Sequence, residues 1–353
     1  MYTRRKLVTA SPSPALQQPL AGTGEDTQLR LHLNENPYGC SLLVQESLSI
    51  YDGFARQPGA PSSSLMRALS RYTGRPSHDL YLANSPSELL WRILSVLTEP
   101  GDGVIAYAPY PAVLREAAAN CHVQLCDAPR TGSRVSAAHA LRLRSATADT
   151  VYVGSPNDPT GDVADPLEVI ALLRAGATVI VDETYVEYTD KGLGILGGEF
   201  PNLISLRSFA PWAGLWGIPV SYAVMSAEMV ERLAVRWSES SLTSSSRIAA
   251  GASLDDSALL LNRVRHVRLE RARLFRRLRK LNFIQPLPSH GPFILCEVTR
   301  GDAGRVQALL EAEGVLVHNC CEEGMPEHIR ISVGTSEQTD QLVAAMVRVS
   351  VAL

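Results

Sequence analysis

Short apolar runs alternate with amphipathic segments through the middle of the chain. Ser64–Tyr72 and Ser87–Leu97 carry apolar residues at spacings of three and four, which predicts helices. Similar helices are expected at Ala112–Asn120 and Leu167–Ala175. The short apolar runs between them predict strands buried on both faces: Gly103–Ala106, Val123–Leu125, Val151–Val153, Thr178–Val181 and Leu203–Leu206. Strands that alternate with helices predict an α/β fold with a parallel sheet and right-handed crossovers.

A second pattern begins at Asp255. Apolar residues repeat mostly at spacings of three and four from Asp255 to Leu281, which predicts one long helix. Its other face carries eight arginines and a lysine, which could contact nucleic acid but is more typical of a solvated helix face. The remaining segments read as strand, helix, strand, strand and helix, and predict a small α+β domain: Phe293–Val298, Val306–Glu313, Val315–Val317, Ile329–Val333 and Gln338–Val349.

The bulk properties exclude several classes of partner. A net charge of −3 provides no global field that would attract nucleic acid or an anionic membrane. Residues 1–29, rich in Pro, Ser, Gln and Gly, predict a flexible arm, and no apolar stretch is long enough for a membrane span. The six cysteines show neither CxxC pairs nor zinc spacing with histidines. We therefore expect a soluble cytoplasmic protein with reduced thiols and no metal site.

Six local motifs occur in a fixed order along the chain. They are LNENPYG at Leu33–Gly39, LTEPGDGVIA at Leu97–Ala106, SPNDPTG at Ser155–Gly161, VDETYVEY at Val181–Tyr188, RSFAPWAGLWGIPVSY at Arg207–Tyr222 and RISVG at Arg330–Gly334. In this order they resemble the class I/II aminotransferases of fold type I, in particular the histidinol-phosphate aminotransferase branch. The resemblance covers about residues 31–349.

The resemblance implies a specific architecture. Residues 48–245 are expected to form a large domain around a mostly parallel seven-stranded sheet. Residues 30–47 and 246–353 are expected to form the small α+β domain. The family's proteins are homodimers that bind pyridoxal phosphate (PLP) near the subunit interface, so a homodimer acting on a small-molecule substrate is expected.

Several family residues are present in the matching motifs. The resemblance places Asp182 at the pyridinium nitrogen of PLP, Tyr185 at the ring hydroxyl and Tyr110 against the ring face. Arg330 matches the arginine that binds a substrate carboxylate through two hydrogen bonds. Ser208 matches a phosphate ligand. Taken as isolated residues, Asp182 could cap a turn and Tyr110 could pack in the core, but the order of the motifs favours the functional roles.

The lysine that would bind PLP covalently is absent. Its position in the Arg207–Tyr222 motif is held by Pro211, which has no side-chain amine and therefore cannot form a Schiff base or act as a general base. The only lysines are Lys6, Lys191 and Lys280, none of them within ten residues of that position.

Most of the phosphate ligands are also replaced. Pro219 stands at the position of the phosphate-binding arginine, and Pro86 removes a backbone N–H donor at a helix N-terminus. Gln57, in RQPG, replaces the tyrosine that reaches the phosphate from the partner subunit. Charge-assisted hydrogen bonds contribute about 1.5–3 kcal/mol each, so two or three such losses weaken binding by roughly a thousandfold or more. These losses predict a protein that uses no cofactor.

A further change alters the charge of the predicted pocket. Asp158 replaces the asparagine of the family's NPTG motif and adds negative charge near Asp182. His318 stands where the family has an arginine that binds the histidinol-phosphate phosphate, which makes that substrate doubtful. The predicted pocket suits a neutral or cationic ligand.

Three functions compete on this basis. The first is a PLP-independent enzyme of small-molecule biosynthesis, with Asp182, Tyr185 and Asp158 as catalytic groups. Its amino-acid-like substrate would be bound by four residues: Arg330, Tyr110, Asn36 and Gln57. The second is a non-catalytic partner of an active enzyme, and the third is a conventional PLP-dependent aminotransferase. Asp182, an ionisable residue retained at a buried strand end, favours the first function. Burial of a carboxyl group costs free energy, and a protein without a working pocket would have no reason to keep it.

Overall fold

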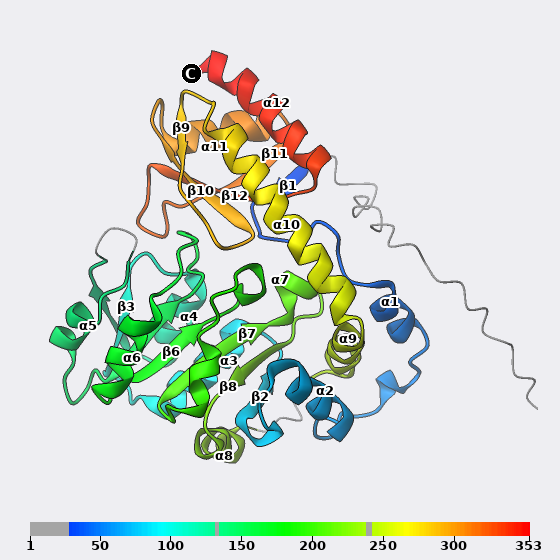
Figure 1. The fold of residues 1–353 in the computed structure, drawn as a ribbon, viewed down its shortest axis with the longest axis vertical. Helices are drawn as coiled ribbons and strands as arrows, with labels where there is room; N and C mark the ends of the chain where they lie inside the picture. Colours follow the sequence, from blue (N-terminus) through cyan, green and yellow to red (C-terminus); the bar gives the residue numbers. More distant parts are fainter. Residues whose placement is uncertain (1–27, 131–133, 238–241) are drawn as a thin grey trace, which may run out of the picture.

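The computed structural model describes residues 28–130, 134–237 and 242–353 (Figure 1). Almost all of the predicted flexible arm, residues 1–29, lies outside these ranges, although Leu29 already begins a strand. Within the described residues, no helix is both long enough and apolar enough to cross a membrane.

The larger sheet has seven strands in the order β2-β8-β7-β6-β5-β3-β4. The five predicted strands correspond to β3 (Gly103–Tyr107), β4 (Gln124–Ala128), β5 (Thr150–Gly154), β6 (Thr178–Asp182) and β7 (Leu203–Ser208), all parallel to one another. The other two strands are β2 (Leu80–Ala83) and β8 (Ser221–Val224). Because β8 runs antiparallel to both of its neighbours, the sheet is mostly parallel, which confirms the expected fold class.

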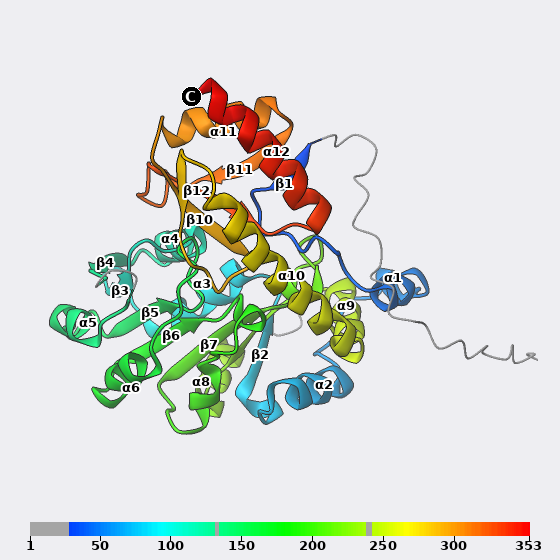
Figure 2. The same ribbon diagram turned by 45° about the horizontal axis from the view of Figure 1, so that its top comes forward.

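Helices cover both faces of this sheet (Figures 1 and 2). Side chains alternate along each strand, so Ile180 points to one face while Val179 and Val181 point to the other. The first face packs on α3 (Pro86–Leu97), α4 (Ala112–Asn120) and α8 (Ala227–Arg236). The opposite face packs on α5 (Ala137–Leu143) and α6 (Pro166–Arg174).

A five-stranded sheet forms the centre of the small domain, in the order β1-β11-β12-β10-β9. The strands are β1 (Leu29–Leu31), β9 (Ile284–Pro286), β10 (Phe293–Val298), β11 (Val315–Asn319) and β12 (His328–Ser332). The helices of this domain are α11 (Ala303–Ala312) and α12 (Ser336–Ala352). Pairing of β1 with β11 brings the N-terminal segment into this sheet.

The predicted long helix is present as α10 (Ser257–Leu278), which begins two residues later than expected, and a separate helix, α9 (Ser244–Asp255), precedes it. Figures 1 and 2 show α10 running from α9 to the small domain. Arg263 of α10 is buried and donates to the carbonyl groups of Tyr38, Gly39 and Cys40. Other arginines of α10 form ion pairs within the chain, which agrees with a solvated face: Arg268 with Asp190, Arg273 with Glu270 and Asp340, and Arg277 with Asp340.

The remaining helical segments connect the strands and the longer helices. They are α1 (Leu42–Ser49), α2 (Ser63–Thr73), the short α7 (Phe209–Ala213) and the 3-10 turns η1 (Gly53–Ala55), η2 (Ser77–Asp79), η3 (Val186–Tyr188) and η4 (Gly194–Gly198). Both α1 and α2 pack against α9.

A fully buried carboxylate fixes the end of β6 against β7. Glu183 accepts hydrogen bonds from the amides of Leu193 and Gly194, from the Ser205 hydroxyl at 2.5 Å and from the Arg207 guanidinium at 2.9 Å. Its side chain is 0% exposed, and that of Arg207 is 16% exposed. This pairing satisfies the buried charge and holds the loop before η4 in place.

We expect Glu183→Ala to lower the free energy of unfolding by about 3–5 kcal/mol, because the buried Arg207 cation then lacks its counter-ion. Urea denaturation of the full chain measures this change. Asp190→Asn is the matched control, because Asp190 pairs with Arg268 at the surface and its side chain is 81% exposed; we expect no measurable change there. Equal destabilisation by the two variants would contradict a structural role for the Glu183 pair.

Candidate functional site

Asp182 is the last residue of β6 and lies where parallel α/β sheets place their sites. Its Oδ2 accepts a hydrogen bond of 2.6 Å from the Tyr152 hydroxyl, and its Oδ1 accepts bonds from the Thr184 amide and hydroxyl. Burial raises the pKa of Asp182, while the hydrogen bonds from Thr184 and Tyr152 oppose that rise. The nearby Asp158 carboxylate raises the pKa of Asp182 further. The result is an oriented carboxyl group that holds a proton more readily than an ordinary aspartate.

Asp158 is at the centre of a second polar cluster. The Tyr185 hydroxyl donates to Asp158 Oδ2 at 3.0 Å, and Asn34 Nδ2 donates to the same oxygen at 3.2 Å. Arg330 of β12 donates to Asp158 Oδ1 through one guanidinium nitrogen and to the His32 carbonyl, at 2.9 Å, through the other. The cluster therefore joins the loop after β5, the end of the large sheet and two segments of the small domain.

Asn34 belongs to this cluster although sequence reasoning did not single it out. Its backbone has a positive φ of 56°, and its amide side chain contacts both Tyr185 and Ser332. A signal was present, because Asn34 lies in the LNENPYG motif two residues before Asn36.

Arg330 already has a carboxylate partner within the chain. The side chains of Arg330 and Asp158 are 10% and 14% exposed, so their ion pair is largely protected from water. Burial lowers the pKa of Arg330, but the charge and hydrogen bond of Asp158, together with the nearby Tyr185 and Cys320, outweigh that effect and the pKa is raised overall. A substrate carboxylate would therefore have to displace Asp158, and the expected role of Arg330 in binding one stays a prediction.

Pro211 lies in the middle of α7 and is buried. Its carbonyl accepts hydrogen bonds from Asn36 Nδ2 at 3.1 Å and from the Tyr188 hydroxyl at 2.9 Å. The Asn36 amide, expected to bind substrate, is thus engaged in holding α7. The next residue after α7 is Gly214, with φ 70°, where a side chain would collide with the backbone of Gly39. The retained parts of this motif therefore have a packing role.

The groups that would bind a phosphate are few in the described residues. Helix α3 begins at Pro86, which has no N–H to donate, and its cap residue Ser85 accepts from the Glu88 amide. The Ser208 hydroxyl accepts from the Ala210 amide at 3.1 Å and so caps α7. Pro219 offers no cation where the family has an arginine. The phosphate end of the site consequently has little to bind a dianion.

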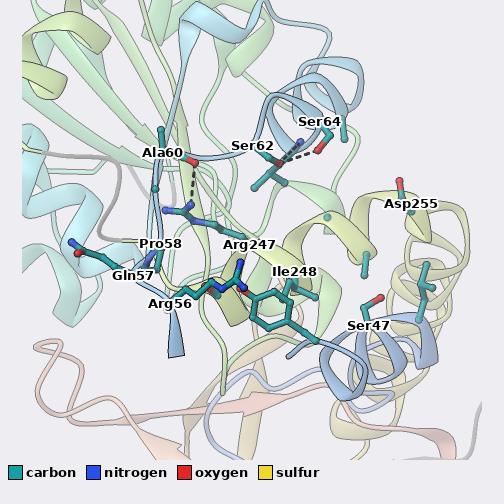
Figure 3. A pocket seen from close by; sticks show the side chains of 18 of the residues that line it. Ser47, Arg56, Gln57, Pro58, Ala60, Ser62, Ser64, Arg247, Ile248 and Asp255 are labelled. Atoms are coloured by element: carbon teal, nitrogen blue, oxygen red, sulfur yellow. Dashed lines mark hydrogen bonds between the residues drawn. The ribbon is translucent and has the colours of Figure 1, made fainter. Parts of the chain in front are cut away.

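Tyr110 lies near the cluster, because Asn157 Nδ2, one residue before Asp158, donates to the Pro109 carbonyl. The Tyr110 hydroxyl donates to Asp127 at 3.1 Å. Gln57 lies elsewhere, in a groove of about 660 Å³ between the 56–60 segment, α1, α2 and α9 (Figure 3). Within one subunit, therefore, the structure brings together Asp158, Asp182 and Tyr185 with Arg330, but not with Gln57.

Known proteins share both the sequence pattern and the fold. A histidinol-phosphate aminotransferase from Roseiflexus castenholzii is 31% identical over 334 residues, which covers 91% of this chain and 90% of the relative. The crystal structure of the histidinol-phosphate aminotransferase from Clostridium acetobutylicum superposes with a TM-score of 0.85 at 19% identity, covering 92% of this chain and all of that one. A histidinol-phosphate aminotransferase from Sinorhizobium meliloti, solved in complex with pyridoxal-5'-phosphate, gives a TM-score of 0.82 at 21% identity, covering 92% and 91%.

These comparisons overturn the expectation that no cofactor is used, because a protein of this fold has been solved with PLP bound. The fit of this chain to PLP is uneven. By the resemblance, Asp182 and Tyr185 match the residues that contact the ring nitrogen and hydroxyl, whereas Pro211 offers no amine and Pro219 no cation for the phosphate. Pro211 cannot bind a cofactor covalently, so none of the roles proposed for Asp158, Asp182 and Tyr185 depends on a covalent bond to PLP.

The family assignment rests on more than single motifs. The family model for aminotransferase class I and II matches residues 46–346, which include most of both sheets. The relatives cover nearly the whole chain at about the same length. The resemblance inferred from the six ordered motifs is confirmed: the chain belongs to the class I and II aminotransferase family.

Proposed function

We propose that this protein is an enzyme of small-molecule biosynthesis that acts on a neutral or cationic amino compound. Its acid and base groups are Asp182, Tyr185 and Asp158, and it forms no covalent bond to a cofactor through position 211. The observation that carries the proposal is the buried ion pair between Asp158 and Arg330.

The ion pair selects against ligands that carry a free carboxylate. Such a ligand would have to displace Asp158 from Arg330, and breaking a buried pair costs about 3–5 kcal/mol, a loss in affinity of more than a hundredfold. It would also face the carboxyl groups of Asp158 and Asp182. An amine needs no such displacement and can donate hydrogen bonds to the carboxyl oxygens of Asp158 and Asp182 while the ion pair stays intact.

The acid and base roles follow from the environments of the groups. Burial, and the charge of Asp158, raise the pKa of Tyr185 well above its usual value, so its hydroxyl stays protonated and can donate. Asp158 is proposed as a further acid/base group because its carboxylate is in direct hydrogen-bond contact with the Tyr185 hydroxyl and with Asn34. Asp182, with its raised pKa, holds a proton more readily than an ordinary aspartate and can donate it at the strand end. Shifted pKa values such as those of Asp182 and Tyr185 are typical of acid/base sites.

The Asp158→Asn variant, in which an amide nitrogen replaces one carboxylate oxygen, tests the proposed selection against carboxylate ligands. We expect the wild-type chain to bind simple amines in preference to the amino acids that carry the same side chain. We expect Asp158→Asn to reverse this preference by at least about tenfold, because Arg330 is then free for a carboxylate. Titration calorimetry with matched amine and amino-acid pairs measures both affinities.

Asp127→Asn is the matched control, because Asp127 accepts from Tyr110 but does not contact Arg330; it should leave the preference unchanged. Tighter binding of amino acids by the wild type would contradict the proposal. If no member of either panel binds, the non-catalytic partner function takes its place.

The second test concerns covalent attachment. When the full chain is mixed with PLP and reduced with borohydride, we expect no single lysine to be labelled stoichiometrically, since Pro211 has no amine. Peptide mapping by mass spectrometry locates any label. The exposed Lys191 is the control for adventitious reaction, and Lys191→Arg should remove only a minor signal. One-to-one labelling of a particular lysine in the wild type would show that another residue has replaced the family's lysine.

We also propose that the protein is a homodimer that pairs through the region around Gln57. Large apolar side chains are exposed there, among them Leu42, Ile50 at 82% and Phe54 at 58%. Static light scattering of the wild type should give twice the 38.2 kDa chain mass. We expect Ile50→Glu to give a monomer, whereas Val235→Glu on α8, also a change of an exposed residue, should not. A wild-type monomer at micromolar concentration would contradict this arrangement.

A further inference from the structure

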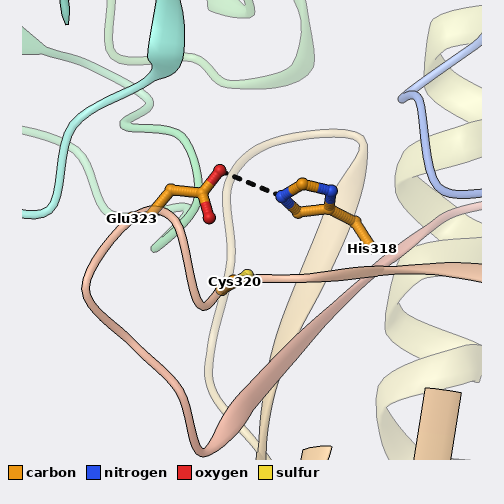
Figure 4. Close-up of side chains that lie close together, drawn as sticks. All are labelled: His318, Cys320 and Glu323. Carbon is orange, nitrogen blue, oxygen red and sulfur yellow. Dashed lines mark hydrogen bonds and ion pairs between the residues drawn. The ribbon is translucent and has the colours of Figure 1, made fainter. Parts of the chain in front are cut away.

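The turn between β11 and β12 brings three different ligand-type side chains together. His318 is the penultimate residue of β11, and Cys320 and Glu323 lie in the turn that follows (Figure 4). The His318 imidazole nitrogen Nε2 is 2.9 Å from Glu323 Oε1, and the ligand atoms of the three residues all lie within 4.8 Å of one another.

The backbone of the turn is held rigidly. The Cys320 amide donates to the His328 carbonyl at 3.0 Å, and the Met325 amide donates to the Cys320 carbonyl at 3.0 Å. The Cys321 amide donates to Asn319 Oδ1 at 3.0 Å. The three side chains are therefore presented from a fixed scaffold, as a binding site requires.

One polar atom of this group has no partner in the protein. Glu323 Oε2 is buried and accepts no hydrogen bond, and the Glu323 side chain is only 8% exposed. Cys320 is fully buried and lies between the same groups. Buried polar atoms nearly always have a partner, so an unpartnered carboxylate oxygen beside a thiol and an imidazole points to a ligand. A His–Glu pair that serves only the turn would not account for that oxygen.

We propose that His318, Cys320 and Glu323 form a binding site for a divalent transition metal of the zinc type. Imidazole, thiolate and carboxylate are the three ligand types that zinc takes, and three protein ligands leave a fourth position open. A thiolate and a carboxylate together balance the charge of a divalent ion. With zinc–sulfur and zinc–nitrogen bonds of about 2.3 and 2.0 Å, tetrahedral coordination places two ligand atoms about 3.5 Å apart. A pair at the 4.8 Å limit therefore closes by about 1.3 Å when the ion binds, which side-chain rotation can supply.

The metal site lies beside the pocket but is separate from it. His318 is the register partner of Arg330, so the two residues are neighbours across β11 and β12. The His318 side chain is 29% exposed, which leaves a path for the ion from solvent. Cysteine spacing did not predict this site, because the pattern sought was paired cysteines with histidines, whereas here each ligand is of a different type.

Cobalt(II) is the probe, because a thiolate ligand gives it an intense near-ultraviolet charge-transfer band. The full chain is first treated with a chelator and then titrated with Co²⁺. We expect one saturable equivalent with the thiolate band and visible bands typical of tetrahedral coordination. Zn²⁺ should displace the cobalt, since zinc binds such sites more tightly.

Adjacent cysteines provide the matched control. Cys320→Ser should abolish the thiolate band, whereas Cys321→Ser, which changes the exposed neighbour, should leave it intact. Glu323→Gln keeps the side-chain shape and should weaken binding by about a hundredfold or more, because even residues outside the ligand shell alter metal affinity by about 10–100-fold. Circular dichroism of each variant checks that the fold is kept.

The result that overturns the proposal is a wild-type titration without a saturable thiolate band, or one in which Cys321→Ser and Cys320→Ser behave alike. Asp182→Asn should leave cobalt binding unchanged. The cobalt titration can therefore fail while the function proposed for the pocket stands, and the reverse.

Discussion

The ion pair between Asp158 and Arg330 is the interaction on which the site depends. It joins the loop that follows β5 in the large domain to β12 in the small domain, and Tyr185 and Asn34 donate to the same carboxylate. Because the pair is largely buried, either partner alone would leave an uncompensated charge, so the ion pair favours the arrangement in which these segments lie together.

The other changes in the site are consistent with this charge balance. Pro211, Pro219 and Pro86 each remove a group that would bind an anion or an aldehyde, while their backbone positions remain packed in α7, before β8 and at the start of α3. The carboxyl groups of Asp158 and Asp182 and the Tyr185 hydroxyl are present, and the one retained arginine, Arg330, is paired with Asp158. Under the proposed function, the pocket therefore disfavours anions at both the phosphate end and the carboxylate end, while the fold is that of the family.

The large-domain sheet could be predicted from local pattern, because strands buried on both faces read as continuous apolar runs. Strands β2 and β8 were missed, since each is only four residues long and β8 contains Ser221 and Tyr222. The long helix was predicted two residues early, because Asp255 ends α9 and the pattern does not mark the break.

The site was predicted less well than the fold. Motif order identified Asp158, Asp182, Tyr185 and Arg330, which the structure brings together, but the role of Arg330 came from the resemblance. The resemblance could not show that a single change from asparagine to Asp158 would give that arginine a partner inside the chain. Three-dimensional proximity was needed for this, as it was for the grouping of His318, Cys320 and Glu323.

The central claim is that the arginine is not available to the ligand. A crystal structure of the full chain with its tightest-binding small amine tests it most directly. The account predicts that Asp158 Oδ1 stays within hydrogen-bond distance of the Arg330 guanidinium while the ligand nitrogen contacts the carboxylates. A bound ligand whose carboxylate takes both guanidinium nitrogens of Arg330, with Asp158 turned away, would contradict it.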